Sequence, residues 1–189
     1  IIKIDDTDLT PENSAKMRDS IQGEQGTRIT LTIRSDNVDR TEELTRRVVV
    51  VPSVSSRMLG NSMVGYLIIT EFNNNTPDQF KRELEKVIGQ GARSLIFDVR
   101  DNKGGRLTDT TRILDRLLPT GPIVSSLDRE ETLSVLATSD ASEIDLPMVV
   151  LINAGTASSA EVFAYALKDY DKARIMGMPS TGEGVMQSI

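Results

Sequence analysis

The chain has 189 residues, of which 38% are hydrophobic and 26% charged, enough apolar material for one medium-sized domain and part of another. Its 22 Lys and Arg residues against 28 Asp and Glu give a formal net charge of −6, which argues against a general nucleic-acid-binding protein, because such proteins need a basic surface. The absence of His and Cys excludes a Ser-His-Asp triad, thiol catalysis, disulfides and metal sites built on these residues. We expect no cofactor, and any hydrolysis must use a Ser or Thr hydroxyl with a base other than His, or a pair of carboxylates.

The first 47 residues predict a small region of mixed helix and strand. An apolar run opens the chain and indicates a domain whose earlier part lies outside this sequence. Thr10 and Pro11 predict a helix start, with Thr10 as the N-cap and Pro11 at the first helical position. Residues 27–34 alternate strictly between polar and apolar side chains and predict a half-buried strand. The polar stretch 35–46 is expected to be a loop or a short strand.

From Val48 onward, strands and helices are predicted to alternate. Apolar runs predict strands at 48–51, 66–72, 95–99, 123–124, 148–152 and 174–176. Helical spacing of apolar residues predicts helices that begin at the capping-box pair Thr76 and Gln79, at Leu107 and at Ala160. The polar stretch 130–143 is expected to be a surface excursion. This order predicts an α/β fold with largely parallel strand pairing.

Three segments are candidates for chemistry. Residues 153–161 follow a buried strand and precede a helix, which places the hydroxyl of Ser158 near the unpaired N–H groups of a helix N-terminus. On spacing alone, capping of the helix explains this hydroxyl better than chemistry does. Residues 98–105 form a strand-to-helix turn whose paired glycines can present N–H groups to an anion, although an ordinary turn looks the same. The third segment, 180–187, is by itself only a polar loop.

Together and in this order, the three segments resemble the C-terminal processing, or tail-specific, serine peptidases. The family pattern D-x-R-x-N-x-G-G is matched by Asp98, Arg100, Asn102, Gly104 and Gly105. The nucleophile pattern N-x-G-S-A-S-A-S-E is matched by Asn153, Gly155, Ala157, Ser158 and Glu161, with substitutions at Thr156, Ser159 and Ala160. The pattern G-x-x-T-x-G-K-G-x-x-Q is matched by Gly177, Gly182, Gly184 and Gln187. Residues 66–80 resemble the opening of the family's core, and residues 1–34 resemble the latter part of a PDZ domain.

The resemblance implies a fold, partners and a location. Residues 1–47 would form a partial PDZ-like domain and connector. Residues 48–189 would form a C-terminally truncated α/β peptidase core of the crotonase/ClpP type, with mixed sheets and helices. The family acts on proteins or peptides bound by their C-termini, outside the cytoplasm, at the cell envelope or in the periplasm. The resemblance leaves open a homo-oligomer and an attachment to the membrane through segments outside this chain.

The resemblance also implies roles for individual residues. The family's nucleophile falls on Ser158. Its oxyanion hole, which is built from backbone N–H groups, falls on Ser159 and on either Gly104 or Gly105. A glutamine that helps to orient the catalytic base falls on Gln187.

The family's general base is a lysine, and its position in this sequence holds Glu183. A neutral lysine takes the serine proton, and its ammonium then stabilises the oxyanion. A carboxylate is a weak base for a hydroxyl, and an ionised carboxylate repels an oxyanion. We therefore expect an impaired serine peptidase that acts through an acyl-enzyme on Ser158. The alternatives are an inactive pseudo-peptidase, a PDZ-type peptide-binding scaffold and, more distantly, a crotonase-like acyl-CoA enzyme.

Overall fold

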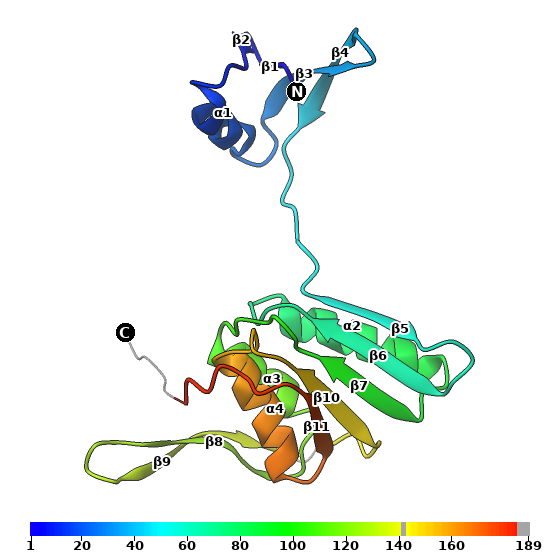
Figure 1. The fold of residues 1–189 in the computed structure, drawn as a ribbon, viewed down its shortest axis with the longest axis vertical. Helices are drawn as coiled ribbons and strands as arrows, with labels where there is room; N and C mark the ends of the chain where they lie inside the picture. The colour runs from blue at the N-terminus through cyan, green and yellow to red at the C-terminus, as the bar shows by residue number, and fades with distance from the viewer. Residues whose placement is uncertain (141–142, 185–189) are drawn as a thin grey trace. The chain divides into compact units, whose positions relative to one another are not determined.

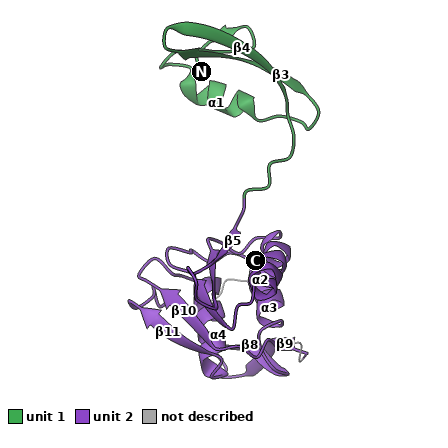
Figure 2. Cartoon of the chain, turned by 90° about the vertical axis from the view of Figure 1, so that its right-hand side faces the viewer, with its two compact units in different colours: residues 1–51 green, residues 52–189 purple. Residues whose placement is uncertain are grey.

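The computed structural model describes residues 1–140 and 143–184 of the chain. The chain divides into two compact units, residues 1–51 and 52–189, each with a hydrophobic core of its own (Figure 2). None of the helices in the described part of the chain has the length and hydropathy needed to cross a membrane.

The first unit is an antiparallel sheet with one helix. Its elements are β1 (Lys3–Ile4), β2 (Thr7–Asp8), α1 (Ser14–Ile21), β3 (Arg28–Ser35) and β4 (Val38–Thr45), with the strands in the order β2-β1-β3-β4. The strand predicted at 27–34 is confirmed by β3. Its alternate residues Ile29 and Leu31 join Ile4 and Met17 in a small core.

One prediction for the first unit is wrong, and one that left two alternatives, a loop or a short strand, is decided for the strand. The helix begins at Ser14 instead of Pro11, because Asn13 precedes the helix and its side chain accepts the N–H of Thr10 at 2.8 Å. The polar stretch 35–46 contains β4, a strand that pairs with β3 along its whole length. Most of β4 is exposed, so its side chains are polar and backbone pairing, not apolar burial, holds it in place.

The second unit is built on a five-stranded sheet in the order β11-β10-β7-β6-β5 (Figure 1). The strands of this sheet are β5 (Val54–Met58), β6 (Val64–Ile69), β7 (Ser94–Asp98), β10 (Met148–Ile152) and β11 (Ala173–Gly177). The predicted parallel pairing is confirmed for β6, β7, β10 and β11, while β5 runs antiparallel to β6. The helices are α2 (Thr76–Gly89), α3 (Leu107–Leu114) and α4 (Ser159–Asp169). A hairpin of β8 (Gly121–Leu127) and β9 (Leu133–Ser139) extends away from this sheet (Figure 1).

The core of the second unit lies between the sheet and its helices. Leu95 and Phe97 on β7 and Val150 on β10 are buried on the same face of the sheet. Phe80 of α2 and Phe163 of α4 pack against Phe97, with ring centroids 5.7 and 5.6 Å away. This packed layer fixes the carboxyl ends of β7 and β10, from which the loops of the candidate site extend.

The strand predicted at 48–51 is wrong. The valines 48–51 form no strand, and all four side chains are more than half exposed. They have no partner strand among the described residues, and an apolar run does not form a strand without one. The surface excursion expected at 130–143 contains β9, a mostly exposed strand that pairs with β8.

The capping box predicted at Thr76 and Gln79 is also wrong. Asn75 precedes the helix, and the hydroxyl of Thr76 accepts the N–H of Asn73 at 2.9 Å. The side-chain oxygen of Gln79 accepts the N–H of Ser53 at 2.7 Å. Both side chains therefore join the start of α2 to neighbouring backbone instead of closing the helix end on itself.

Candidate active site

Three loops meet at the carboxyl end of the parallel strands, the edge where α/β sheets bind ligands. We name them the β7 loop (99–105), the β10 loop (153–158) and the β11 loop (178–184). The N–H of Ala157 donates to the carbonyl of Asn102 at 3.0 Å, and the N–H of Thr181 donates to the carbonyl of Thr156 at 2.9 Å. The three segments singled out in the sequence therefore lie side by side, as far as residue 184.

Ser158 has a strained backbone at the junction of the β10 loop and α4. Its φ is 53° and its ψ is −127°, a combination that residues with a side chain rarely adopt. A sharp strand-to-helix turn of this kind presents a serine hydroxyl at the top of a sheet in many hydrolases. Such strain costs about 1–3 kcal/mol and persists only where the surroundings hold it, so it points to a functional position.

Two backbone N–H groups beside Ser158 are available to an anion. The N–H of Ser159 is at the first position of α4, where the helix offers no acceptor. The N–H of Gly105 also has no acceptor among the described residues. The N–H of Gly104, by contrast, donates to the side chain of Asn102 at 2.8 Å. Of the two glycines that the sequence left as alternatives, Gly105 is the one with an available N–H.

Gly104 allows the β7 loop to approach the turn at Ser158 and Ser159 closely. Its φ is 90°, and a Cβ at this position would lie 2.8 Å from the Cβ of Ser158 and 2.9 Å from the N of Ser159. Both distances are far below van der Waals contact. Any side chain here would push the two loops apart and cover the Ser159 amide.

Two asparagines hold the shapes of the loops. Asn102 is fully buried; its Nδ2 donates to the carbonyl of Ile69 at 2.9 Å while its Oδ1 accepts the N–H of Gly104. Oδ1 of Asn153 accepts the N–H of Asp101 at 2.9 Å, which joins the β10 loop to the β7 loop. Because these amides use both donor and acceptor groups, they make the loops rigid.

Glu161, in the first turn of α4, joins the turn at Ser158 to the β11 loop. Its buried carboxylate accepts four hydrogen bonds, from the N–H of Ser158 (3.1 Å), the hydroxyl of Ser180 (2.7 Å), and the N–H groups of Gly182 (2.7 Å) and Glu183 (3.2 Å). Burial raises the pKa of this carboxyl, but the four hydrogen bonds outweigh burial and hold the pKa below its usual value. In the sequence Glu161 stood out only as a match to the family pattern, although a Glu three residues after a Ser is a known capping signal.

Asp98, at the end of β7, fixes the start of the β7 loop. Its buried carboxylate accepts Nε of Arg100 at 2.9 Å, Nη2 of Arg100 at 2.6 Å, and the hydroxyl of Tyr66. Burial raises the pKa of Asp98, but these hydrogen bonds bring it below its usual value. Burial and the bond to Asp98 raise the pKa of the Tyr66 hydroxyl. Arg100 is therefore held against Asp98 and is not a free cation.

The backbone of Glu183 lies close to that of Ser158. The N–H of Glu183 and the N–H of Ser158 donate to the same oxygen, Oε2 of Glu161, while the side chain of Glu183 is exposed. Gln187 lies outside the described residues. The roles assigned to these residues stay predictions.

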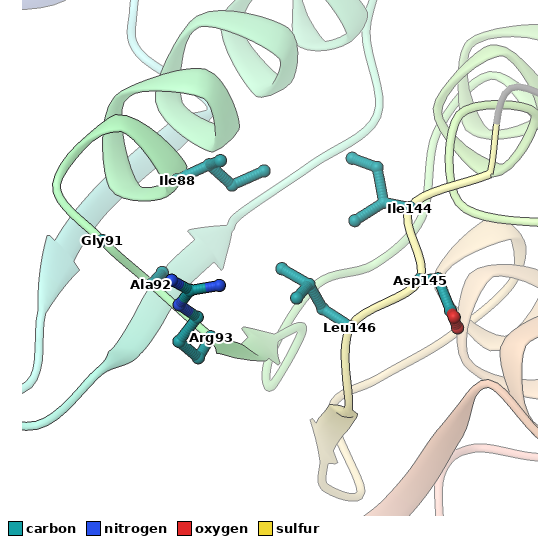
Figure 3. A pocket seen from close by; sticks show the side chains of 7 residues that line it. All are labelled: Ile88, Gly91, Ala92, Arg93, Ile144, Asp145 and Leu146. Atoms are coloured by element: carbon teal, nitrogen blue, oxygen red, sulfur yellow. The ribbon is translucent and has the colours of Figure 1, made fainter.

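A pocket of about 450 Å³ lies elsewhere, at the amino end of β7. Ile88, Ile144 and Leu146 point toward one another across it (Figure 3). Because β7 and β10 run parallel, this end of the sheet is opposite to the end that carries Ser158. The pocket is not part of the candidate active site.

The comparison with protein families settles which family this site belongs to. The model of peptidase family S41 matches residues 63–189. The chain belongs to peptidase family S41. A Staphylococcus epidermidis protein named a probable CtpA-like serine protease is 34% identical over 172 residues, 89% of this chain and 35% of the relative. A Staphylococcus aureus protein of the same name is 30% identical over 171 residues, 89% of this chain and 34% of the relative. The chain thus spans about a third of the length of these curated S41 relatives.

Solved structures share the S41 fold. The photosystem II D1 C-terminal processing protease is 28% identical to this chain, with a TM-score of 0.66. The superposition covers 100% of this chain and 53% of that one. A lipoprotein from Streptococcus agalactiae has a TM-score of 0.57 at 17% identity, covering 69% of this chain and 51% of that one, which shows a likeness of fold alone. The predicted mixed α/β peptidase fold is confirmed.

Proposed function

We propose that this S41 chain is the catalytic part of a serine peptidase that cleaves protein substrates near the C-terminus through an acyl-enzyme on Ser158. One observation carries the proposal: a strained serine lies beside two available N–H groups, those of Ser159 and Gly105. Acyl transfer requires this combination, because the hydroxyl attacks the substrate and the amides bind the oxyanion that forms.

The proposed reaction has two halves. The Oγ of Ser158 attacks the carbonyl carbon of the scissile peptide, its proton passes to a base, and the carbonyl oxygen becomes an oxyanion. The N–H groups of Ser159 and Gly105 bind this oxyanion. The intermediate then expels the amine, which takes up a proton, and leaves the acyl-enzyme. Water repeats the attack and releases a new carboxylate.

We infer that this peptidase is impaired. The position at which the resemblance places the catalytic lysine holds Glu183, whose backbone is joined to that of Ser158 through Glu161. A carboxylate at this place accepts a proton weakly and repels the oxyanion when it is ionised. The same observation favours the second candidate, an inactive pseudo-peptidase that serves as a peptide-binding scaffold.

We propose that the first unit is part of a PDZ domain and that the second unit is a peptidase core of the crotonase/ClpP type. The antiparallel sheet and single helix of the first unit support this proposal. A PDZ domain binds peptide C-termini by adding a strand to its sheet. The two units divide after Val51, so the connector belongs to the first unit.

We propose that the substrates are proteins or peptides bound by their C-termini, and that the protein works at the cell envelope or in the periplasm. The CtpA-like relatives and the fold shared with a lipoprotein support this location. The proposal leaves open a homo-oligomer and an attachment to the membrane through segments outside this chain.

Cleavage of an unstructured polypeptide tests the proposal. We expect slow cleavage near the C-terminus by the wild-type chain, none by Ser158→Ala, and less with a substrate whose C-terminus is amidated. Mass spectrometry of the products locates the cut. Equal cleavage by Ser158→Ala would overturn the peptidase, and no cleavage by either the wild type or Glu183→Lys would favour the pseudo-peptidase.

A further inference from the structure

Three acidic side chains near Ser158 accept hydrogen bonds from neighbouring groups. Asp98 is bonded to Arg100, and Glu161 accepts four hydrogen bonds. Oδ1 of Asp101 accepts Nδ2 of Asn153 at 3.0 Å. A carboxylate that already accepts several hydrogen bonds is a poorer proton acceptor. Asp98 and Glu161 are therefore poor candidates for the base that acyl transfer on Ser158 requires.

The cations around the site differ from one another. Arg100 is held by Asp98, and Arg106 lies 3.4 Å from Oδ2 of Asp109. Arginine also stays protonated in proteins and cannot act as a base. Lys103 is exposed and makes no hydrogen bond or ion pair with any described residue. It is the one lysine among the described residues of the three loops.

The backbone at Lys103 lies close to Ser158. Lys103 directly precedes Gly104, where an added Cβ would lie 2.8 Å from the Cβ of Ser158. Consecutive Cα atoms are about 3.8 Å apart. The flexible four-carbon stem of a lysine covers such an offset. The buried Asn102 on its other side fixes the backbone from which this stem extends.

We propose that Lys103 is the group that accepts the proton of Ser158 during acylation. This proposal rests on the proposed function. As the bond from Oγ to the acyl carbon forms, the O–H bond of Ser158 breaks and its proton goes to the lone pair of Nζ. The carbonyl π electrons move to oxygen, and the leaving group then departs with its electron pair. The resulting ammonium lies near the oxyanion and stabilises it.

The burst of p-nitrophenolate from p-nitrophenyl acetate tests the proposal, because it measures acylation of a serine directly. We expect a burst from the wild type, and a burst rate lower by about 10²-fold or more in Lys103→Gln. Lys103→Arg should not restore it, because a guanidinium stays protonated. The control is Lys81→Gln, an exposed lysine of α2 without a described partner, which should leave the rate unchanged.

The outcomes separate this proposal from the proposed function. A wild-type rate in Lys103→Gln, with no burst in Ser158→Ala, would overturn the role of Lys103 and leave the peptidase standing. Restoration by Lys103→Arg would show that charge, not proton transfer, matters, and would also overturn it. Glu183→Lys added to Lys103→Gln should restore acylation. Failure of this rescue would assign the loss to the loop structure, and no burst in any variant would overturn both proposals.

Discussion

Oε2 of Glu161 accepts the N–H of Ser158 at 3.1 Å, so a carboxylate in the first turn of α4 fixes the backbone of the proposed nucleophile. The same carboxylate accepts the N–H groups of Gly182 and Glu183 from the β11 loop. The nucleophile turn and the loop at the family's base position thus share one anchor, and a change in Glu161 displaces both.

Glu161→Gln is predicted to lower acylation of Ser158 by about 10²-fold, because a small misplacement of reacting groups is costly. An amide has a single acceptor oxygen, so it cannot hold all four donors. The p-nitrophenolate burst gives the rate. Glu130→Gln, at the exposed tip of the β8–β9 hairpin, is the matched control and should acylate at the wild-type rate. An unchanged rate in Glu161→Gln would contradict the shared anchor.

The stability of Glu161→Gln is predicted to depend on pH. The pKa of Glu161 is lowered in the folded chain, so its stabilisation is complete above the pKa of the unfolded chain and is lost as pH falls through the folded value. At neutral pH the variant should lose about 2 kcal/mol of unfolding free energy. Urea unfolding should show this difference shrinking as the pH falls through the folded-state pKa of Glu161. A difference that stays constant with pH would show that the ionised carboxylate is not what stabilises the loops.

Gly104→Ala is predicted to destabilise the second unit by about 1–3 kcal/mol and to abolish acylation. The added Cβ would overlap Ser158 and Ser159, and the positive φ strains any side chain. Gly89→Ala is the matched control. Gly89 ends α2 in open space, so alanine should be neutral or stabilise the unit by about 0.5–1 kcal/mol. Thermal unfolding compares the two variants, and an active, stable Gly104→Ala would show that the loops are not in close contact.

Ser159→Ala is predicted to keep acylation at the wild-type rate. The Oγ of Ser159 is buried without a hydrogen-bond partner among the described residues, so its removal should leave stability unchanged or raise it by about 1 kcal/mol. The backbone N–H, which is the group proposed to bind the oxyanion, remains in the variant. A large loss of acylation without unfolding would assign that role to the hydroxyl instead.

Glu183→Lys is predicted to raise peptide cleavage by about 10²-fold or more, because it places an amine at the position of the family's base. Glu183→Gln is the control, since it removes the carboxylate without adding a base. A similar gain in both variants would mean that repulsion by the carboxylate, and not the missing amine, limits the reaction. No gain in either would point to a scaffold that has lost activity for other reasons.

The parallel strands of the core could be predicted from the sequence, because short apolar runs that alternate with helical patterns indicate them locally. Leu95 and Phe97 belong to a short apolar run that can only be buried, and the turn with Gly104 follows directly. For residues 35–46 the sequence left a loop and a short strand open, because the residues of β4 face solvent and its pairing with β3 depends on a neighbour instead of on its own composition.

The site was only partly predictable for a similar reason. The family motifs assigned Ser158, Gly104 and residue 183 to one site, but they could not show which glycine N–H is available to bind an anion. That depends on the side chain of Asn102, which takes the N–H of Gly104. The anchoring role of Glu161 depends on donors from the β11 loop, and no local pattern encodes such a contact.

The most direct test of the account is to locate the adduct of a serine-directed phosphonate by tandem mass spectrometry of the wild-type chain. A phosphonate reacts with a serine that is both activated and backed by oxyanion-binding amides. The account predicts one adduct, on Ser158, which disappears in Ser158→Ala and is strongly reduced in Gly104→Ala. An adduct on a different serine, or no adduct in either the wild type or Glu183→Lys, would contradict it.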